Sequence, residues 1–291
     1  MKNLGMIVNL HKPAAVETAR RLLQWGQERG CPILLPHQEA SALTTAGLDD
    51  EDWLRTVQIA LVVGGDGTFL RAARYVLDSD IILHGINLGH LGFLASSRPE
   101  EAERDLEDIL DGRFEVLKRR VLRCVLHRDE TPLHTLHALN DVVLSKNAIA
   151  RLLHIEVRFD DRFFGVLPAD GVIISSPTGS TAYALAAGGP NIPPHMDSML
   201  LAPLCAHTLY SRPLMAAATD RISLIPRGSS RDIVLTQDGQ LAYEVFPGDR
   251  IDVELSKDKF IQTVVLPGRS FLDLLQEKLG WGRSLGLPSA E

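Results

Sequence analysis

A glycine-rich loop between a buried strand and a helix constrains this chain more than any other feature. Residues 59–63 are all apolar and include β-branched side chains, which is typical of a parallel strand buried on both faces. Directly after them come Gly64, Gly65, Asp66, Gly67 and Thr68, and a helical pattern then begins. Glycines permit a sharp turn and a close approach of the backbone to a ligand. The order of strand, glycine loop and helix therefore predicts a loop whose N–H groups bind phosphate.

One acidic residue, Asp66, lies among these glycines. A carboxylate beside phosphate-binding amides is expected to hold a metal ion or to accept a proton. The plainer interpretation is a tight turn in which Asp66 caps the helix, and the pattern leaves both open. The chain contains no G-x-x-x-x-G-K-[ST] P-loop, and Leu70 stands where a G-x-G-x-x-G fingerprint needs its third glycine. An ordinary nicotinamide-dependent dehydrogenase is therefore disfavoured.

The composition indicates a soluble globular protein of two domains. With 291 residues, 45% of them hydrophobic and 23% charged, the chain can form a sizeable core. Its net charge of −7 argues against general nucleic-acid binding, and the basic cluster at 118–120 with Arg123 is interpreted as a solvated strand face. Three cysteines, at positions 31, 124 and 205, form neither a disulfide framework nor a zinc pattern. We expect a cytoplasmic protein without a leader or a membrane span.

Strand and helix patterns alternate over the first part of the chain. Strands are expected at residues 4–8, 31–35, 59–63 and 81–87, and helices at 13–29, 69–75 and 99–112. Pro13 suits the first turn of its helix, and Gly30 and Gly112 are expected to end theirs. Alternation of this kind predicts an open parallel sheet. At the end of the chain, a capping-box-like start at Ser270 predicts a helix, through Leu279, that returns to the first domain.

After about residue 114 the pattern changes to short strand-like runs. These runs cover residues 115–117, 123–126, 138–144, 155–159, 162–167, 171–175, 221–226, 232–237, 241–246, 251–255 and 260–266. Asp160-Asp161 and Asp238-Gly239 are hairpin turn signals between them. Many short strands at this spacing predict an all-β domain.

A second candidate site follows the strand-like run at 171–175. Residues 176–183 combine hydroxyls with small side chains, which suits the many acceptors of a nucleotide, and Tyr183 offers a ring for stacking. Asp170, just before the run, can accept hydrogen bonds from ribose hydroxyls. The alternative is a serine- and threonine-rich loop that only caps a short helix.

Two weaker candidates lie earlier in the chain. Asn140 can pair with an adenine edge and Asp141 with a ribose diol, although Asn-Asp is also common at the start of a strand. His134 and His137 are three residues apart, but no third metal ligand lies near them in sequence. They are therefore interpreted as ordinary solvated or half-buried histidines.

Taken together, these motifs resemble the bacterial NAD kinases. The resemblance rests on GGDGT at 64–68, NDVVL at 140–144, ADG at 169–171, SPTGSTAYALAAGGP at 176–190 and LGWG at 279–282. GGDGT alone is shared with diacylglycerol and sphingosine kinases, so by itself it indicates only phosphoryl transfer. The long stretch at 176–190 is much more specific.

The resemblance implies a fold of the class α/β plus all-β. A Rossmann-like parallel-sheet domain is expected at residues 1–117, joined by a C-terminal helix at 268–291, and an all-β dinucleotide-binding β-sandwich at 118–267. The implied reaction transfers the terminal phosphate of ATP, or of polyphosphate, to the 2′-hydroxyl of the adenosine ribose of NAD, giving NADP. The family also implies a divalent cation, Mg²⁺, and a homodimer or homotetramer that binds neither nucleic acid nor a membrane.

Matched by position, the resemblance assigns roles to individual residues. Asp66 is the expected catalytic residue. The expected phosphate loop consists of Gly64, Gly65, Gly67 and Thr68. Nucleotide contacts are expected from Asp66, Gly67, Arg71, Asn140, Asp141, Arg151, Asp170, Thr181, Ala182, Tyr183, Ala186 and Gln240. The sequence assigns no metal ligands.

Three positions depart from the family pattern. Asp141 replaces a commoner Glu and is shorter by one methylene, Ala186 replaces a Ser hydroxyl, and Pro168 stands where some members have Arg. These changes are expected to alter affinity, or the preference between NAD and NADH, without changing the reaction type.

Two rival functions remain open from the sequence. A lipid kinase would share the GGDGT loop, but it would need a basic or apolar membrane-facing surface that the sequence does not display. A catalytically silent dinucleotide sensor would keep the binding residues, and the presence of Asp66 argues against it.

Overall fold

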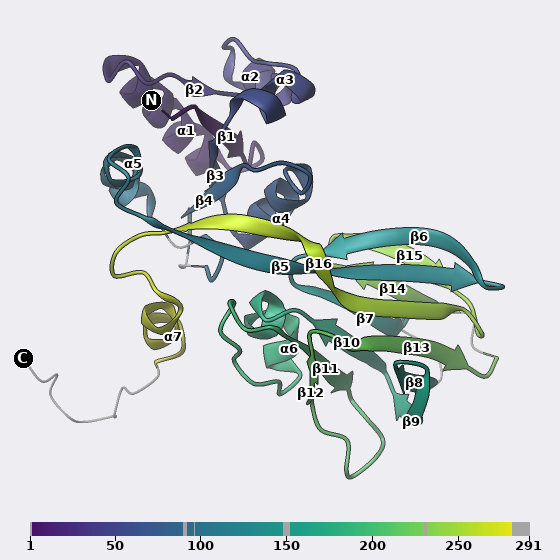
Figure 1. Cartoon of the computed structure of the whole chain (residues 1–291). Helices are drawn as coiled ribbons and strands as arrows, with labels where there is room; N and C mark the ends of the chain where they lie inside the picture. The colour runs from purple at the N-terminus through teal and green to yellow at the C-terminus, as the bar shows by residue number, and fades with distance from the viewer. Residues whose placement is uncertain (1, 90–91, 96, 148–151, 230–231, 281–291) are drawn as a thin grey trace, which may run out of the picture. The chain divides into compact units, whose positions relative to one another are not determined.

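The computed structural model describes residues 2–89, 92–95, 97–147, 152–229 and 232–280. The chain divides into two compact units, Met1–Leu117 with Gln262–Glu291, and Lys118–Ile261 (Figure 1). Two strands carry the chain from one unit into the other, namely β5 (Glu115–Arg128) and β16 (Arg250–Val265).

The first unit is built on a parallel sheet. The strand order is β2 (Ile33–Leu34), β1 (Leu4–Val8), β3 (Ile59–Gly64) and β4 (Ile82–Asn87), and the end of β16 pairs in parallel with β4. Leu4 and Met6 pack in one hydrophobic cluster with helix α1 (Pro13–Glu28), whereas the intervening Gly5 faces Trp53. Both faces of β1 are therefore covered, which confirms the expected buried parallel sheet.

Most helices of this unit follow the sequence pattern. The remaining helices are α2 (His37–Leu43), α3 (Asp50–Thr56), α4 (Asp66–Tyr75), α5 (Ala102–Leu110) and α7 (Phe271–Leu279), with the 3₁₀-helix η1 (Pro99–Glu101) before α5. Pro13 occupies the first turn of α1, and Gly112 adopts a positive φ after α5, as predicted. Helices α2 and α3 were not predicted, because seven residues are too few to establish a helical period.

Helix α7 belongs to the first unit, as expected for a returning C-terminal helix. Its capping box is formed, since Ser270 accepts from the Asp273 N–H and the Asp273 carboxylate accepts from the Ser270 N–H. Leu274 and Leu275 are its buried residues. The Phe271 ring packs against Phe93 of the same unit.

The second unit is antiparallel. One sheet has the order β12-β11-β10-β7-β14-β15. In the other, β16, β13, β8 and β9 follow one another, β5 pairs with β16, and β6 pairs with β5. The bounds are β6 Thr131–Ala138, β7 Asp141–Lys146, β8 Leu153–Phe159, β9 Arg162–Ala169, β10 Gly171–Ser175, β11 Ser198–Leu204, β12 Leu214–Ala217, β13 Arg221–Arg227, β14 Ile233–Gln237 and β15 Leu241–Val245. Alternate residues of both sheets form one buried cluster. This is the core of a β-sandwich, as expected.

The details of the strands differ from the sequence prediction in two ways. Strands β5 and β16 are single strands of 14 and 16 residues, whereas the sequence suggested two short runs for each. Arg119 in the middle of β5 is only 8% exposed, and Arg120 beside it donates to the Ser256 carbonyl. The interpretation of this basic cluster as a solvated strand face was therefore wrong for Arg119.

Both predicted hairpin turns are confirmed. Asp160 and Asp161 have φ values of 48° and 68°, and Asp238 and Gly239 have values of 50° and 62°. Two consecutive left-handed residues are typical of the tight turns that match the twist of paired strands. Within the described ranges, no helix is long and apolar enough to cross a membrane.

Candidate active site

The glycine loop connects β3 directly to α4. Gly65 is the N-cap of α4 in an extended conformation, and Asp66 is the first helical residue. A Cβ on Gly64 would lie 2.3 Å from the Thr68 hydroxyl oxygen, so the end of β3 has no room for a side chain there. The first turn of α4, with the positive end of its dipole, therefore lies at the carboxyl end of the parallel strand.

The Asp66 carboxylate is held by a neighbouring loop. Its Oδ1 atom accepts a hydrogen bond from the Ala95 N–H at 3.2 Å, and no side chain caps the helix. A Cβ on Gly92 would lie 2.0 Å from the same Oδ1 atom. The loop after β4 thus lies directly against the carboxylate, and the alternative in which Asp66 serves as the helix cap is wrong.

The carboxyl end of β4 adds groups that the sequence analysis missed. Asn87 is buried there, and a Cβ on Gly65 would lie 3.7 Å from its Oδ1 atom. A cavity of about 540 Å³ opens beside it, lined by Asn87, Leu88, Gly89, Arg98, Pro99, Glu100, Glu277 and Lys278. Ligands of parallel α/β sheets bind at the carboxyl ends of strands, and this is the signal that could have drawn attention to Asn87.

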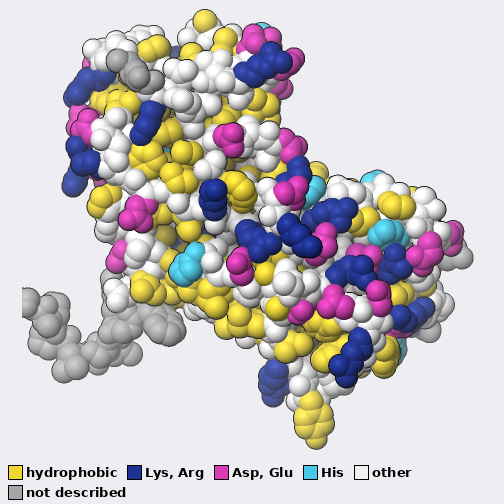
Figure 2. Space-filling model, viewed as in Figure 1, with side chains coloured by type: hydrophobic (Ala, Val, Ile, Leu, Met, Phe, Trp, Pro, Cys, Tyr) yellow, Lys and Arg dark blue, Asp and Glu magenta, His cyan; other side chains and the backbone are white. Residues whose placement is uncertain are grey.

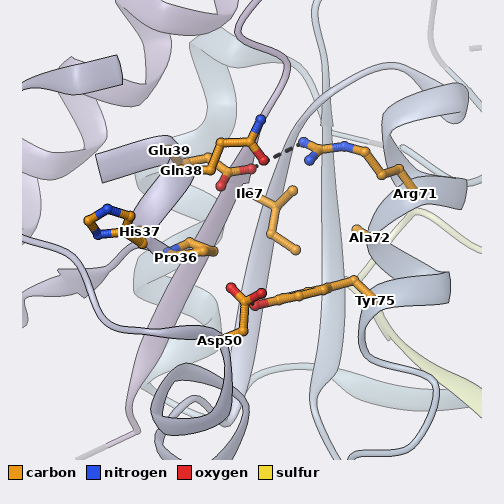
Figure 3. Close-up of a pocket in the computed structure, with 9 residues that line it drawn as sticks. All are labelled: Ile7, Pro36, His37, Gln38, Glu39, Asp50, Arg71, Ala72 and Tyr75. Atoms are coloured by element: carbon orange, nitrogen blue, oxygen red, sulfur yellow. Dashed lines mark hydrogen bonds and ion pairs between the residues drawn. The ribbon is translucent and has the colours of Figure 1, made fainter. Parts of the chain in front are cut away.

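Arg71 lies in a second cavity, between α4 and the segment after β2 (Figure 3). Its guanidinium donates to the Val8 carbonyl at 2.9 Å and to Glu39 at 3.2 Å, and Glu39 is almost completely buried while Arg71 remains 43% exposed. The cavity measures about 570 Å³. Across it, the Tyr75 hydroxyl donates to Asp50, and burial together with that bond raises the tyrosine pKa. Arg71 is therefore anchored but still accessible to an anion.

In the second unit, a compact loop follows β10. It consists of the 3₁₀-helix η2 (Thr178–Thr181) and the short helix α6 (Tyr183–Ala186). The Ser176 hydroxyl donates to the Leu139 carbonyl, and the Ser180 hydroxyl donates to Pro177 and accepts from the Ile192 N–H. Both serines are completely buried, so their hydroxyls build the loop instead of facing a ligand.

The loop packs directly on the Asn140-Asp141 pair. A Cβ on Gly179 would lie 2.1 Å from the Asn140 carbonyl oxygen, and the Ser176 N–H donates to that oxygen at 2.8 Å. Tyr183 is 50% exposed at the start of α6. The structure therefore brings together the two second-unit motifs that the sequence analysis treated separately.

The buried carboxyl group of Asp141 lies near that of Asp238, which is only partly buried. Asp238 in the β14–β15 turn accepts hydrogen bonds from the N–H groups of Leu139, Asn140 and Asp141 at 3.0, 2.7 and 3.2 Å. Burial and the nearby Asp238 charge raise the pKa of Asp141 to about 7. Asp238 had been assigned only a turn role from the sequence, and Gln240 lies in the same turn. Neutral and ionised forms of Asp141 therefore interconvert near neutral pH.

Asp170 is already ion-paired. Lys146 at the end of β7 lies 2.8 Å from its carboxylate, and both side chains are half-buried. Lys146 was not identified from the sequence. Arg151 lies outside the described residues.

Charges are mixed over the visible surface. Figure 2 shows Lys and Arg side chains interspersed with Asp and Glu side chains. Exposed ion pairs of the second unit include Arg123–Glu254 at 2.9 Å and Arg221–Asp161 at 2.5 Å. Over the part of the chain that the structure describes, no group of three or more His, Cys, Asp or Glu side chains is arranged to hold a metal ion.

Family models match both parts of the chain. Residues 4–114 match the model of the ATP-NAD kinase N-terminal domain, and residues 139–265 match that of the ATP-NAD kinase C-terminal domain. The chain is 39% identical over 286 residues to the NAD kinase of Moorella thermoacetica, covering 98% of this chain and 91% of the relative. It is 38% identical over 287 residues to the NAD kinase of Geotalea daltonii, covering 97% and 99%.

Two solved structures share the fold. Yeast NADH kinase complexed with NADH superposes with a TM-score of 0.88, at 23% identity, covering 99% of this chain and 90% of that one. An NAD kinase from Archaeoglobus fulgidus in complex with ATP superposes with a TM-score of 0.71, at 22% identity, covering 95% and 96%.

Proposed function

This chain belongs to the NAD kinase family, and we propose that Asp66 of its first unit is the catalytic residue while strand ends and a loop of its second unit bind the dinucleotide. The chain is an NAD kinase, which uses ATP to convert NAD into NADP. The observation that supports the residue assignment is the Asp66 carboxylate, fixed by the Ala95 N–H at the start of α4.

A ribose hydroxyl is a poor nucleophile at neutral pH. Asp66 accepts its proton as the bond to phosphorus forms, which is the usual role of a carboxylate in general base catalysis. The rest of phosphoryl transfer depends on positioning and on neutralising the phosphate charge. The phosphate charge can be neutralised by the backbone amides of Gly65 and Gly67 and by the positive end of α4. Gly64 and Thr68 pack against each other in the same loop.

A divalent cation completes the proposed chemistry. Mg²⁺ in proteins is commonly held by one or two carboxylates together with substrate phosphates, so a preformed cage of several ligands is not required. Asp66 is the carboxylate that the glycine loop offers to such an ion. When bound, the ion would neutralise charge on the transferred phosphate.

We assign the dinucleotide to a set of residues in the second unit and to two in the first. Asn140 and Asp141 suit the adenine edge and a ribose, and Tyr183 offers its half-exposed ring. The whole set is Gly67, Arg71, Asn140, Asp141, Arg151, Asp170, Thr181, Ala182, Tyr183, Ala186 and Gln240. The assay below, repeated with polyphosphate in place of ATP and with NADH in place of NAD, tests the range of donors and acceptors.

We also propose a cytoplasmic homo-oligomer, a dimer or a tetramer. Support for self-association comes from the edge strand β9, where the Phe163 and Phe164 side chains are 57% and 63% exposed. Apolar side chains on an exposed edge commonly mark a protein interface. Support for a reducing compartment comes from the cysteines, since Cys31, Cys124 and Cys205 are free thiols.

The assignment of Asp66 is tested by NADP formation. The enzyme is incubated with ATP, Mg²⁺ and NAD, and NADP is measured with an NADP-specific dehydrogenase. Asp66→Asn should lower turnover by roughly 10²–10⁴-fold, the usual contribution of a general base, while calorimetry shows that NAD still binds. Asp111→Asn, the same change on an exposed side chain at the end of α5, should leave turnover unaffected. Near-normal turnover of Asp66→Asn would assign the proton transfer to another group.

A further inference from the structure

The loop that lies against Asp66 is tied to the C-terminal segment by Arg269. This arginine, just before α7, donates to both carboxylate oxygens of Asp105 on α5 at 3.0 and 3.2 Å, and also to the Ser97 hydroxyl. Ser97 and Asp105 are completely buried. A bidentate guanidinium–carboxylate pair has a restricted geometry, so Arg269 and Asp105 together hold the Ser97 side chain in one position.

His84 of β4 completes this buried network. Its Nε2 atom lies 3.1 Å from the Ser97 hydroxyl oxygen and 3.7 Å from the Asp105 carboxylate. Burial alone would raise the pKa of Asp105, but the nearby polar groups of His84 and Ser97 and the positive charge of Arg269 outweigh it and lower the pKa. Asp105 is therefore ionised and remains a strong partner for Arg269.

Ser97 and Ala95 both lie against β4, and Ala95 contacts Asp66. The Ser97 N–H donates to the Gly85 carbonyl at 3.1 Å, and its own carbonyl accepts from the Asn87 N–H at 2.8 Å, so Ser97 is fixed beside β4. A Cβ on Gly85 would lie 2.6 Å from the Ala95 Cα, so Ala95 packs directly on the strand. The Ala95 N–H then donates to Asp66.

Helix α7 also contacts the loop that follows β4. The Phe93 ring lies 6.3 Å from that of Phe271, and the Lys278 ammonium lies 4.4 Å from the centre of the Phe93 ring. Arg98 pairs with Glu277 at 2.7 Å. The C-terminal segment therefore holds the loop on both sides of Ala95.

We propose that Arg269 and Ser97 are positioning residues for Asp66, holding the Ala95 N–H in place so that the carboxylate is oriented to accept the ribose proton. This inference rests on the catalytic role proposed above for Asp66. Catalytic groups need to be held within about 0.5 Å of the productive geometry, and a displacement of about 1 Å can cost roughly 10²-fold in rate. No residue of the network needs to touch a substrate for this to matter.

Turnover and substrate affinity together test the proposal. Arg269→Lys keeps the charge but loses the fork, and Ser97→Ala removes a single oxygen. Each should lower kcat by about tenfold or more and leave KM for NAD within about twofold, because the ground-state contacts to NAD are unchanged. Arg29→Ala is the matched control, since Arg29 pairs with Glu107 on the same helix α5 but is exposed. Its kcat should equal that of the wild type.

Two further measurements separate positioning from general stability. Hydrogen exchange of the Ala95 amide should quicken in Arg269→Lys and Ser97→Ala, while exchange in β3 stays slow. In an Asp66→Asn background, the same two substitutions should have no further effect on kcat, because their effect operates through Asp66.

Four outcomes would overturn the proposal. One is a lower Tm with unchanged kcat in both variants, which would make the network purely structural. Another is an equal fold loss of kcat with and without Asp66. Normal turnover of Asp66→Asn alone would remove the proposed role of Asp66 and this inference with it. The last outcome is a low turnover of Asp66→Asn together with normal turnover of Arg269→Lys and Ser97→Ala. It would overturn this inference but leave the proposed role of Asp66 intact.

Discussion

The carboxyl group of Asp141, in the second unit, changes its charge near neutral pH. Burial and Asp238 raise its pKa to about 7, so it is neutral below that pH and ionised above it. An ionised Asp141 accepts hydrogen bonds from a ribose diol more strongly than a neutral one does. We therefore expect NAD affinity, measured by calorimetry, to increase from pH 6 to pH 8, by at most about tenfold per pH unit.

Two variants check the origin of this pH dependence. Asp141→Asn cannot ionise, so its NAD affinity should not change through neutral pH. Asp238→Asn removes the neighbouring charge, so the midpoint should move to lower pH. An unchanged profile in Asp141→Asn would show that another group titrates.

At the scale of single residues, the sequence predicted which residues belong to a candidate site better than it predicted the groups that contact them. Asp66 was proposed because it is the one acid in a glycine loop after a strand, and Asp141 because an Asn-Asp pair suits a nucleotide and matches the family motif. Their partners were not, since Ala95 is 29 residues from Asp66 and Asp238 is 97 residues from Asp141. A local pattern of residue types carries no information on such distant contacts, which arise only when the strands pair.

The loop formed by η2 and α6 is held by internal hydrogen bonds and leaves the ring of Tyr183 half-exposed. Its buried serines are bonded within the fold, whereas Tyr183 is 50% exposed. Tyr183→Ala should therefore weaken NAD binding by roughly 1–3 kcal/mol, as loss of stacking usually does, without unfolding the loop. Tyr210→Ala, which removes a ring that is 92% exposed in the same unit, is the control and should bind NAD normally. Unchanged NAD affinity of Tyr183→Ala in a calorimetric titration would leave the loop a purely structural role.

Among whole elements, the sequence predicted those with a clear period and missed those that are short or interrupted by charge. Helix α1 was predicted because apolar residues recur on one face over 16 residues. Strand β5 was divided in two by its basic cluster, although Arg120 is bonded to the neighbouring strand β16 through the Ser256 carbonyl. Charged side chains within a strand are compatible with pairing when long side chains reach such acceptors, and the sequence alone does not reveal these.

For the molecule as a whole, the change from strand–helix alternation to closely spaced strands predicted a parallel sheet followed by an antiparallel sandwich. Local patterns did not predict that β5 and β16 are each one unbroken strand with residues in both units. Whether a strand is unbroken depends on the strands that pair with it. The proposed phosphate loop belongs to the first unit, and most proposed dinucleotide contacts belong to the second. The proposal therefore assigns a part of the reaction to each unit.

The choice of hydroxyl is a property of this whole set of residues. If Asn140, Asp141 and Tyr183 hold the dinucleotide as proposed, it can present only one hydroxyl to the donor phosphate, and effective concentration then favours that hydroxyl by orders of magnitude. We expect 2′-deoxy-NAD to bind with nearly the affinity of NAD but to accept no phosphate. The 3′-deoxy analogue is the matched control and should be phosphorylated. Phosphorus NMR of the NAD product should show a single 2′-monophosphate, whereas a 3′-phosphate, or efficient phosphorylation of diacylglycerol, would contradict the assignment of the acceptor.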